Sequence, residues 1–337
     1  MEIVHRIVAP GILGALLTVA ANAALAGPPM PPLGYTWQPI AELTDEFNGT
    51  SLDTNKWLNY HPYWSGRGST FDPANVSLGN GGLALQSTAT TVTNIRAACV
   101  SSKTKAAASG CYYEASVMAS KLSMTSSFWF QGSYSEIDVT ETLGASLRNP
   151  GGNLLMPMNT HYFTNGWGSD IYTSRQWNMP TGCEAEFHTY GVWWRDSRNL
   201  TMYHNGTAVA DISPGGDFLE SQYMFFDTEV FSWEGTPTLA SLQDPTRNTM
   251  YVDWVRAWKL VPVATNSPSL TASVSNGNLL VSWPQDHVGW TLQVRTNSQP
   301  AGPGTNWSPM INSRTTNLMV DPIDRNSGST FYRLEYP

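Results

Sequence analysis

The segment Ser135–Glu141 reads Ser-Glu-Ile-Asp-Val-Thr-Glu and places three carboxylates within six residues. Successive side chains of a β-strand point to opposite faces, so Glu136 and Asp138 share one face. In a regular strand Glu141 would point to the other face. One extra residue at Val139–Thr140, a β-bulge, brings Glu141 back beside them, and bulges are common next to active sites. The segment therefore predicts a bulged strand with an acidic face.

This acidic face has a catalytic interpretation. With the bulge, Glu136 and Glu141 lie about four strand steps apart, roughly 13 Å between their Cα atoms. Two glutamates that lean together on a curved sheet bring their carboxyl groups to about 5–5.5 Å, the separation used by a retaining glycoside hydrolase. The alternative is a solvated strand face that happens to be acidic. The segment alone leaves both interpretations open.

The rest of the chain has the pattern of an all-β protein. Aromatic residues make up 12% and charged residues 13% of the chain, which also has 28 Gly, 22 Pro and 14 Trp. This composition favours many short strands and turns over long helices. From Tyr35 to about Val261, short alternating segments end at turn residues; Leu200–Tyr203, for example, precedes Asn205-Gly206, a strong hairpin signal. Repeated strands at this spacing predict two stacked antiparallel sheets, a sandwich or jelly roll.

The two ends of the chain differ from this central part. Residues 1–26 have the pattern of a secretory signal peptide, with an apolar run followed by small residues at Ala24–Ala26. A transmembrane anchor fits less well, because Pro10, Gly11 and Gly14 interrupt the short apolar run. Residues 27–261 would form the main domain, and residues 262–268 a linker. Residues 269–337 predict a small β-sandwich module. We expect a secreted, extracellular protein without membrane insertion.

The charge and the cysteines narrow the partners and the compartment. A formal net charge of −8 with no basic cluster disfavours nucleic acid and anionic membranes. Three cysteines suit an oxidising compartment. Cys99 and Cys111 flank a segment interpreted as a hairpin centred near Lys105, which predicts a disulfide across it and leaves Cys183 free.

The segment Glu136–Glu141 resembles the Glu-x-Asp-x-x-Glu signature of glycoside hydrolase family 16, in its bulged form. Across roughly residues 35–261 the chain is similar to the β-agarase and β-porphyranase branch of that family. The resemblance implies a concanavalin A-like jelly roll in which one concave sheet forms an open cleft for a polysaccharide. The supporting matches are Asp45–Gly49, Leu52–Trp57, Asn159–Phe163, Tyr190–Asp196 and Tyr251–Arg256.

The resemblance also implies roles for the three carboxylates. Glu136 would be the nucleophile and Glu141 the general acid and base of a retaining mechanism. Asp138 would hydrogen-bond the nucleophile and help to set its charge. Glu136 must be ionised while Glu141 is protonated, and burial with neighbouring negative charge raises the pKa of the acid. Hydrolysis of this kind requires no cofactor.

The loop His61–Arg67 resembles one that borders the minus subsites in the agar-cleaving branch. Trp64 would stack on a galactose ring; the alternative is an aromatic that packs the loop. A guanidinium forms paired hydrogen bonds with sulfate oxygens, and porphyran-cleaving relatives use arginines in this way, so Arg67 leaves a sulfated substrate open. Gln131, before the nucleophile, is neutral and no second arginine accompanies it. This favours neutral agarose.

Further substrate-binding candidates come from the same resemblance. Trp129 resembles a stacking tryptophan near the cleavage site, and His161 matches a histidine that hydrogen-bonds substrate hydroxyls. Glu229 and Trp233 match a pair at the cleft edge, and Trp167 is a fainter candidate. For each tryptophan the alternative is a role in core packing. For His161 the alternative is a structural role.

Many family members carry a structural calcium ion away from the cleft. The matching positions are Glu46, Gly82 and Asp253, which supply oxygen atoms of the kind that calcium prefers. The alternative is an Asp253 that is hydrogen-bonded without an ion.

These observations predict a secreted endo-acting hydrolase of a red-algal galactan, which cuts the β-1,4 bonds of agarose with retention. The first alternative is a β-porphyranase on sulfated porphyran. The second is a non-catalytic jelly-roll carbohydrate-binding protein, which the intact acidic triad disfavours. The loop His61–Arg67 disfavours a β-1,3-glucanase. The C-terminal module would bind carbohydrate through Trp283, Trp290 or Trp307, or assist export or attachment; core packing is the default for these tryptophans.

Overall fold

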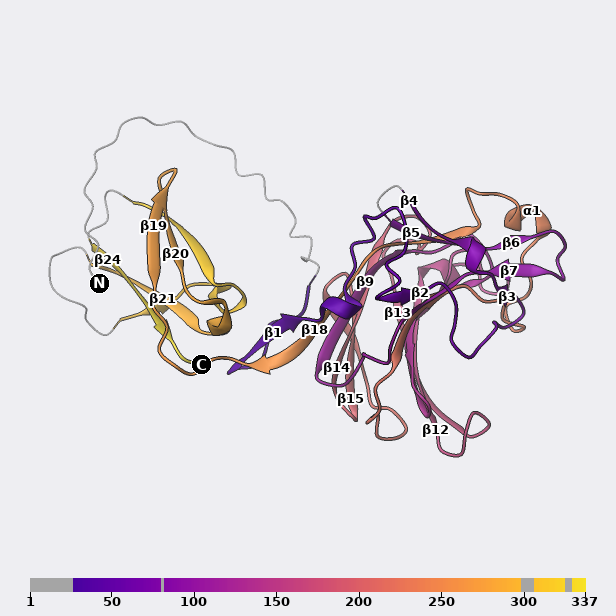
Figure 1. Cartoon of the computed structure of the whole chain (residues 1–337), viewed down its shortest axis with the longest axis horizontal. Helices are drawn as coiled ribbons and strands as arrows, with labels where there is room; N and C mark the ends of the chain where they lie inside the picture. The colour runs from indigo at the N-terminus through magenta and orange to yellow at the C-terminus, as the bar shows by residue number, and fades with distance from the viewer. Residues whose placement is uncertain (1–26, 80–81, 298–305, 325–328) are drawn as a thin grey trace. The chain divides into compact units, whose positions relative to one another are not determined.

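The computed structural model describes residues 27–79, 82–297, 306–324 and 329–337. The chain forms two compact units, one of residues 39–259 and one of residues 29–38 together with 260–337 (Figure 1). The sequence had placed residues 29–38 with the larger domain. The predicted signal peptide lies outside the described residues. Within these residues no helix is long and apolar enough to cross a membrane.

The larger unit is built mainly from two antiparallel sheets. We call the first the site sheet, because it carries the acidic segment. Its strands are, in spatial order, β13 (Asp170–Asn178), β12 (Leu155–Phe163), β11 (Ser135–Leu143), β10 (Thr125–Gln131), β17 (Tyr223–Asp227), β8 (Cys99–Ser102) and β2 (Trp57–Leu58).

The second sheet, the back sheet, packs against the first. Its strands are β16 (Thr207–Ile212), β15 (Asn199–His204), β14 (His188–Asp196), β9 (Cys111–Met118), β18 (Thr249–Pro262), β5 (Gly82–Gln86) and β4 (Val76–Gly79). β1 (Tyr35–Pro39) also pairs with β18, and residues 35–38 of β1 and 260–262 of β18 are counted with the smaller unit.

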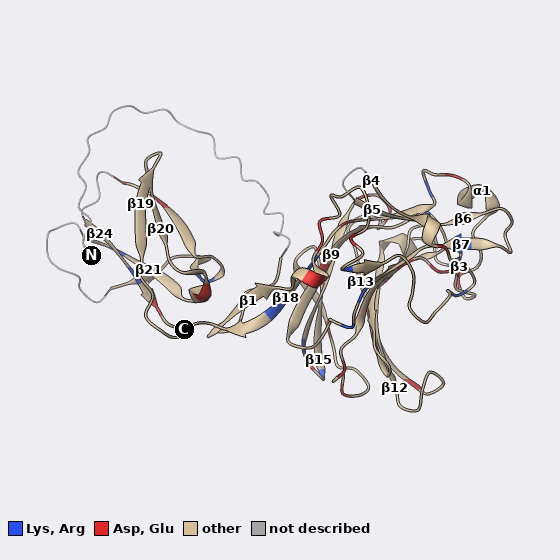
Figure 2. Cartoon of the chain, in the orientation of Figure 1, with Lys and Arg blue, Asp and Glu red and all other residues tan. Residues whose placement is uncertain are grey.

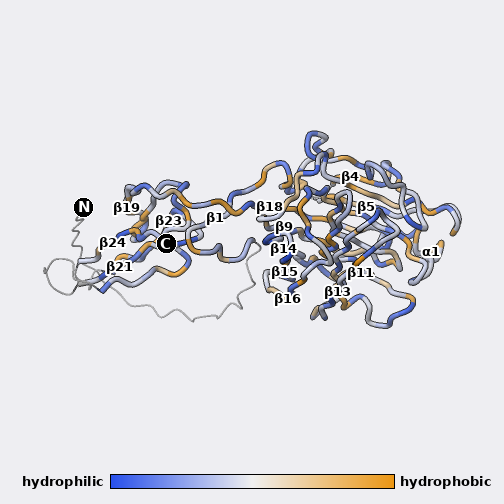
Figure 3. The backbone as a smooth tube through the Cα atoms, turned by 90° about the horizontal axis from the view of Figure 1, so that it is seen from below, coloured by the Kyte–Doolittle hydropathy of each residue, from blue (hydrophilic) through white to orange (hydrophobic). Residues whose placement is uncertain are grey.

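A single apolar core lies between the two sheets. Ile137 and Val139 of β11 and Phe128 and Phe130 of β10 are fully buried in it, together with Tyr113 of β9. Burial of apolar surface stabilises a fold by about 25 cal/mol per Å². Figure 3 shows the underlying pattern, since hydrophobic and hydrophilic residues follow one another along the strands. The core therefore holds one face of β11 and leaves the other face available for polar side chains.

The other elements of the larger unit are short. A small sheet contains β3 (Thr70–Phe71), β7 (Ile95–Ala97) and β6 (Thr88–Ala89). Three 3-10 helices are η1 (Ala41–Leu43), η2 (Pro73–Asn75) and η3 (Gly152–Leu154), and α1 (Leu239–Leu242) is the only α-helix in the described chain. The expected all-β jelly-roll sandwich is confirmed. Charged residues are sparse along the ribbon (Figure 2).

The smaller unit contains two three-stranded sheets. One is formed by β19 (Thr271–Ser275), β20 (Asn278–Ser282) and β23 (Leu318–Pro322), the other by β22 (Ser308–Pro309), β21 (Thr291–Asn297) and β24 (Ser329–Glu335). Two 3-10 helices, η4 (Gln285–His287) and η5 (Ser313–Thr315), connect them. Trp283 and Trp290 are buried, 4% and 7% exposed, so they pack the interior of the module. Trp307 is half-buried and lies against the Arg333 guanidinium.

The predicted disulfide between Cys99 and Cys111 is wrong. Cys99 begins β8 in the site sheet, opposite Asp227, whereas Cys111 begins β9 in the back sheet, opposite Trp194. The segment between them crosses from one sheet to the other and is not a hairpin. Both thiols and that of Cys183 are free and buried. Burial raises the pKa of the Cys183 thiol to about 12, which keeps it protonated and unreactive.

Candidate active site

The β-bulge predicted in β11 is present. Phe128 of β10 pairs with Thr140, and the next residue, Trp129, pairs with Asp138, so Val139 is the extra residue. Val139 is fully buried in the core. Two residues later, Glu141 lies opposite Ser127 and accepts a hydrogen bond on the polar face of the sheet. The bulge therefore changes which residues face the core.

The strand β12 supplies two neighbours of the carboxylates. His161 lies directly opposite Glu136, and Asn159 lies opposite Asp138. The Asn159 Nδ2 atom donates to Glu141 Oε2 at 3.0 Å, and His161 Nε2 lies 3.3 Å from Asp138 Oδ2. These contacts place Glu136, Asp138 and Glu141 on the same face of the site sheet, as predicted.

The strand β10 supplies a neighbour on the opposite side. Gln131 lies opposite Glu136 in the β10–β11 pair, and its Nε2 donates to Glu136 Oε2. The Gln131 Oε1 atom in turn accepts a hydrogen bond of 2.8 Å from the Tyr63 hydroxyl. The amide of Gln131 thus connects the loop His61–Arg67 to the first glutamate. The sequence did not assign this role to Tyr63 or to Gln131.

Burial and mutual repulsion keep protons on this cluster. Burial, and then the charge of Asp138, raise the pKa of Glu141 to about 8. The pKa of Asp138 is also raised by burial, although its hydrogen bond to His161 opposes that shift. Because several acids share the site, they cannot all be ionised at neutral pH. Burial, and then the charge of Asp138, also raise the pKa of Glu136 well above its ordinary range, so Glu136 and Glu141 compete for the retained proton.

His161 carries the balancing positive charge. Burial lowers its pKa, but its contacts with Asp138, Glu136 and Asp170 outweigh that effect and raise the pKa to about 10. Ligand atoms of Glu136, Asp138 and His161 lie within 4.8 Å of one another, which resembles a metal-binding cluster. A protonated imidazole has no lone pair, so a metal would have to displace the proton that the neighbouring carboxylates hold on His161. The group acts as an ion network around the carboxylates.

Several substrate-binding candidates come together at the neighbouring edge of the site. Trp64 is 45% exposed, and its Nε1 donates to Glu229 Oε1 at 2.9 Å. The Arg67 guanidinium lies 5.9 Å from the centre of the Trp64 ring and 5.1 Å from that of Phe231. Trp233 is 59% exposed and contacts Phe231, with 5.3 Å between the ring centres. The tertiary structure thus joins two segments that are far apart in the sequence.

Trp129 and Trp167 have different surroundings. Trp129 is half-buried beside Asp138; it stacks on Phe225 at 4.5 Å, and its Nε1 donates to Asp227 Oδ2 at 3.0 Å. Trp167 is 54% exposed and lies 4.5 Å from the Phe163 ring at the end of β12. The position of Trp129 next to the carboxylates therefore depends on a stack with a neighbouring strand.

Two contributors had no clear signal in the sequence. Asp170 accepts from His161 Nδ1 at 2.8 Å, but it lies at the start of β13, outside every motif. Asn159 belongs to a recognised segment, yet its contact with Glu141 depends on the bulge in the adjacent strand. Only the pairing of β11, β12 and β13 brings these side chains together.

The predicted calcium ligands have a competing partner. Both carboxylate oxygens of Glu46 accept hydrogen bonds of 2.8 Å from the Arg256 guanidinium. Gly82 and Asp253 are neighbours, since a Cβ atom on Gly82 would lie 3.9 Å from the Asp253 Cα. These residues would fit calcium only if Arg256 released Glu46. Calcium at this site stays a prediction.

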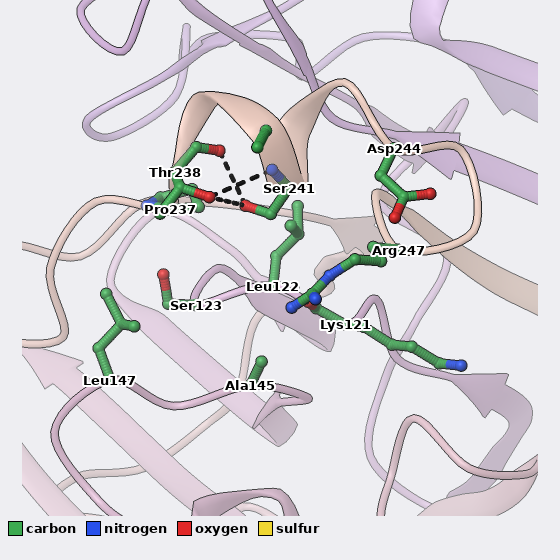
Figure 4. A pocket seen from close by; sticks show the side chains of 11 residues that line it. Lys121, Leu122, Ser123, Ala145, Leu147, Pro237, Thr238, Ser241, Asp244 and Arg247 are labelled. Atoms are coloured by element: carbon green, nitrogen blue, oxygen red, sulfur yellow. Dashed lines mark hydrogen bonds between the residues drawn. The ribbon is translucent and has the colours of Figure 1, made fainter.

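A separate pocket of about 230 Å³ opens beside the loop that follows β11 (Figure 4). None of the three carboxylates lines it. Figure 4 shows Leu147 and Ala145 on one side of the pocket and α1 with Thr238 and Ser241 on another. The pocket is therefore distinct from the acidic site.

Comparison with known proteins agrees with this geometry. The family model described as beta-porphyranase A-D, GH16 domain, matches residues 37–260. Beta-porphyranase E of Zobellia galactanivorans is 33% identical over 255 residues, which cover 69% of this chain and 91% of that relative. Beta-agarase AgaB34 of Agarivorans albus is 29% identical over 272 residues, covering 70% of this chain and 60% of the agarase.

A solved structure of a beta-porphyranase is also similar to this chain. The crystal structure of a beta-porphyranase from the human gut bacterium Bacteroides plebeius superposes with a TM-score of 0.61 and 30% identity, covering 70% of this chain and 96% of that one. The chain therefore belongs to glycoside hydrolase family 16, in its β-agarase and β-porphyranase branch of retaining glycoside hydrolases.

Proposed function

We propose that the protein is a secreted endo-acting hydrolase that cuts β-1,4-galactosidic bonds in a red-algal galactan with retention. The observation that carries this proposal is the bulge at Val139, which puts Glu136 and Glu141 on one face with Asp138 between them. A protein that only binds sugar has no need for this arrangement. The family membership of the chain supports the same chemistry.

The reaction would proceed in two balanced steps. Glu136 attacks the anomeric carbon, the glycosidic C–O bond breaks, and Glu141 gives its proton to the leaving oxygen. Water then attacks the anomeric carbon of the glycosyl-enzyme and gives a proton to the Glu141 carboxylate. The bond to Glu136 breaks, so both residues return to their starting states.

The surroundings favour this division of labour. The His161 cation lies near both Glu136 and Asp138, and the amide of Gln131 donates to Glu136. Both contacts favour an ionised nucleophile. Glu141, with a pKa of about 8, holds the proton that the leaving group needs.

Among red-algal galactans, we propose porphyran as the preferred substrate. Arg67 offers an exposed guanidinium beside Trp64, a pairing that suits a sulfate on a stacked sugar. The lack of a second arginine beside Arg67 and the neutral Gln131 had favoured agarose. Because its amide contacts Tyr63 and Glu136, Gln131 is better explained as a residue that holds the nucleophile. The matched family model and the relatives named as porphyranases support this choice.

Agarose is the second candidate. In the described chain, Arg67 is the only arginine whose guanidinium lies against the Trp64 and Phe231 rings. A heavily sulfated chain would meet only this guanidinium at that edge. Agarose, which requires no such contact, therefore stays a specific alternative.

Release of reducing ends from native porphyran, desulfated porphyran and agarose separates these candidates. We expect the highest kcat/KM on native porphyran and a loss of about 10-fold or more for Arg67→Gln on that substrate alone. Arg175→Gln is a matched control, because Arg175 is exposed on β13 opposite the core residue Met158. A kcat/KM on agarose that equals or exceeds the value on porphyran, and that Arg67→Gln leaves unchanged on both substrates, would favour agarose.

The roles of the two glutamates need a separate experiment. Glu136→Gln should lower kcat at least about 1000-fold on every galactan. Glu141→Gln should lose far less activity on a nitrophenyl glycoside, whose leaving group needs no proton, than on the polysaccharide. Circular dichroism checks that both variants fold. Near-normal turnover of either variant on polysaccharide, or retention on agar in affinity electrophoresis without any release of sugar by the wild type, would contradict the proposal.

A further inference from the structure

Two glutamates outside the acidic triad accept hydrogen bonds from the segments on either side of β11, one from the turn before the strand and one from the loop after it. At its start, Glu220 accepts hydrogen bonds from three consecutive backbone N–H groups in the turn between β10 and β11. Its Oε2 accepts from Ser133 N at 2.6 Å, and its Oε1 accepts from Tyr134 N at 2.7 Å and Ser135 N at 3.0 Å. The Ser135 hydroxyl also donates to Oε1 at 2.8 Å. Glu136 is the next residue in the chain.

The loop that follows the end of β11 at Leu143 has a similar arrangement. Glu234, only 1% exposed, accepts from the Ser146 hydroxyl at 3.0 Å, from Leu147 N and from Arg148 N at 3.3 Å. Leu147 lies on the loop that follows β11, and Figure 4 shows that loop beside the separate pocket. Glu234 directly follows Trp233, so it also joins this loop to the exposed aromatic edge of the site.

The turn before β11 has room for the Glu220 carboxylate. A Cβ atom on Gly132 would lie 2.2 Å from Glu220 Cδ, so glycine leaves the space that the carboxylate occupies. Gln222, which is fully buried, adds a hydrogen bond of 2.7 Å to the Ser135 hydroxyl. Several donors on one carboxylate form short, charge-assisted hydrogen bonds that are stronger than neutral ones.

We propose that Glu220 and Glu234 are positioning residues, which fix the spacing of Glu136 and Glu141 by holding the turn before β11 and the loop after it. The inference rests on the proposed roles of these two glutamates. A bulged strand has interrupted pairing at Val139, so its own ladder restrains the relative position of the two carboxylates less well. Misplacement of a reacting group by about 1 Å can cost roughly 100-fold in rate.

The test compares Glu220→Gln, Gly132→Ala and Glu234→Gln with a matched control, Glu186→Gln. Glu186 is an exposed glutamate that accepts a hydrogen bond from Thr181 in the loop before the back-sheet strand β14. The Gly132 variant displaces the end of a flexible Glu220 side chain without removing it, so two different substitutions examine the same contact. For each protein, kcat, KM, the pH profile and the melting temperature are measured on galactan.

We expect the three test variants to lose about 10- to 100-fold in kcat, with KM within about 3-fold of wild type. The basic limb of their kcat profile should move, because the surroundings of Glu141 change, while Glu186→Gln should match wild type. Wild-type kcat and pH profile in folded Glu220→Gln and Glu234→Gln would overturn the inference, even if both melt earlier. If Glu220→Gln does not fold, Gly132→Ala decides the outcome at that end of the strand.

Different results would overturn the proposed function and the positioning roles. Full activity of Glu136→Gln or Glu141→Gln would overturn the proposed function itself. Inactive Glu136→Gln and Glu141→Gln together with fully active Glu220 and Glu234 variants would overturn only the positioning roles.

Discussion

The Nε2 atom of His161 on β12 lies 3.3 Å from Oδ2 of Asp138 on the paired strand β11. The other ring nitrogen lies 2.8 Å from Asp170 Oδ2, so the imidazole has an acid on each side. This sandwich keeps the histidine charged at neutral pH. A fixed cation next to buried carboxylates lowers the cost of ionising one of them.

Removal of this cation should impair the nucleophile. We expect His161→Gln to lower kcat about 10- to 100-fold, because Glu136 would lose the neighbouring charge that favours its ionised form. Asp170→Asn should have a smaller effect in the same direction, since Asp138 alone would still favour protonated His161. Steady-state kinetics of both variants between pH 5 and 9 checks this. A kcat for His161→Gln within 2-fold of wild type would show that the charge is not needed.

The fall of kcat at high pH should reflect the loss of the proton from Glu141. As its pKa is raised to about 8, the acid form predominates below pH 8 and is lost above it, so kcat should fall as pH rises through about 8. Asn159→Ala removes a hydrogen bond that favours the ionised form, and the basic limb should then move to higher pH. Asn199→Ala at the start of the back-sheet strand β15 is the control, because Asn199 is exposed and lies outside the site sheet. An unchanged limb in Asn159→Ala would mean that another group sets it.

The cysteines give a prediction about folding in an oxidising compartment. Because Cys99 and Cys111 begin strands of different sheets, the native protein should have no disulfide between them. Thiol titration of the denatured, unreduced protein should find three free thiols, and a reducing agent should leave the melting temperature unchanged. A count of one thiol would restore the disulfide that the sequence suggested.

Two buried histidines should make the fold sensitive to acid. Burial, and then neighbouring His188, lower the pKa of His204 to about 4, and burial alone lowers that of His61 to about 4. An unfolded chain binds these protons near pH 6.5. The contribution of these two histidines to the free energy of unfolding should therefore be fully present above about pH 6.5 and be lost as pH drops towards 4.

Urea unfolding of wild type and His204→Asn at pH 7, 5.5 and 4.5 checks the sign. The variant should lose less stability on acidification, although His61 leaves part of the slope in place. A variant that loses as much as wild type would show that the pair His188–His204 does not contribute.

The sequence predicted much of the site because its main signals are local. The spacing of Glu136, Asp138 and Glu141 fixes which side chains can share a face, and it requires a bulge if all three are to do so. Turn residues and alternating segments likewise predicted an all-β sandwich. Both inferences depend on the period of a strand, which neighbouring residues determine.

The tertiary structure decided what touches these residues. The pairing of β12 with both β11 and β13 brings Asp170 to His161, and the order of the strands separates Cys99 from Cys111. Glu220 accepts hydrogen bonds from the turn before β11, and Glu234 from the loop after it. In each contact the two residues are 85 to 88 positions apart in the chain. A sequence specifies the face of each side chain through backbone geometry. Which distant side chain meets that face depends on the pairing and packing of whole sheets, and these are cooperative properties of the complete fold.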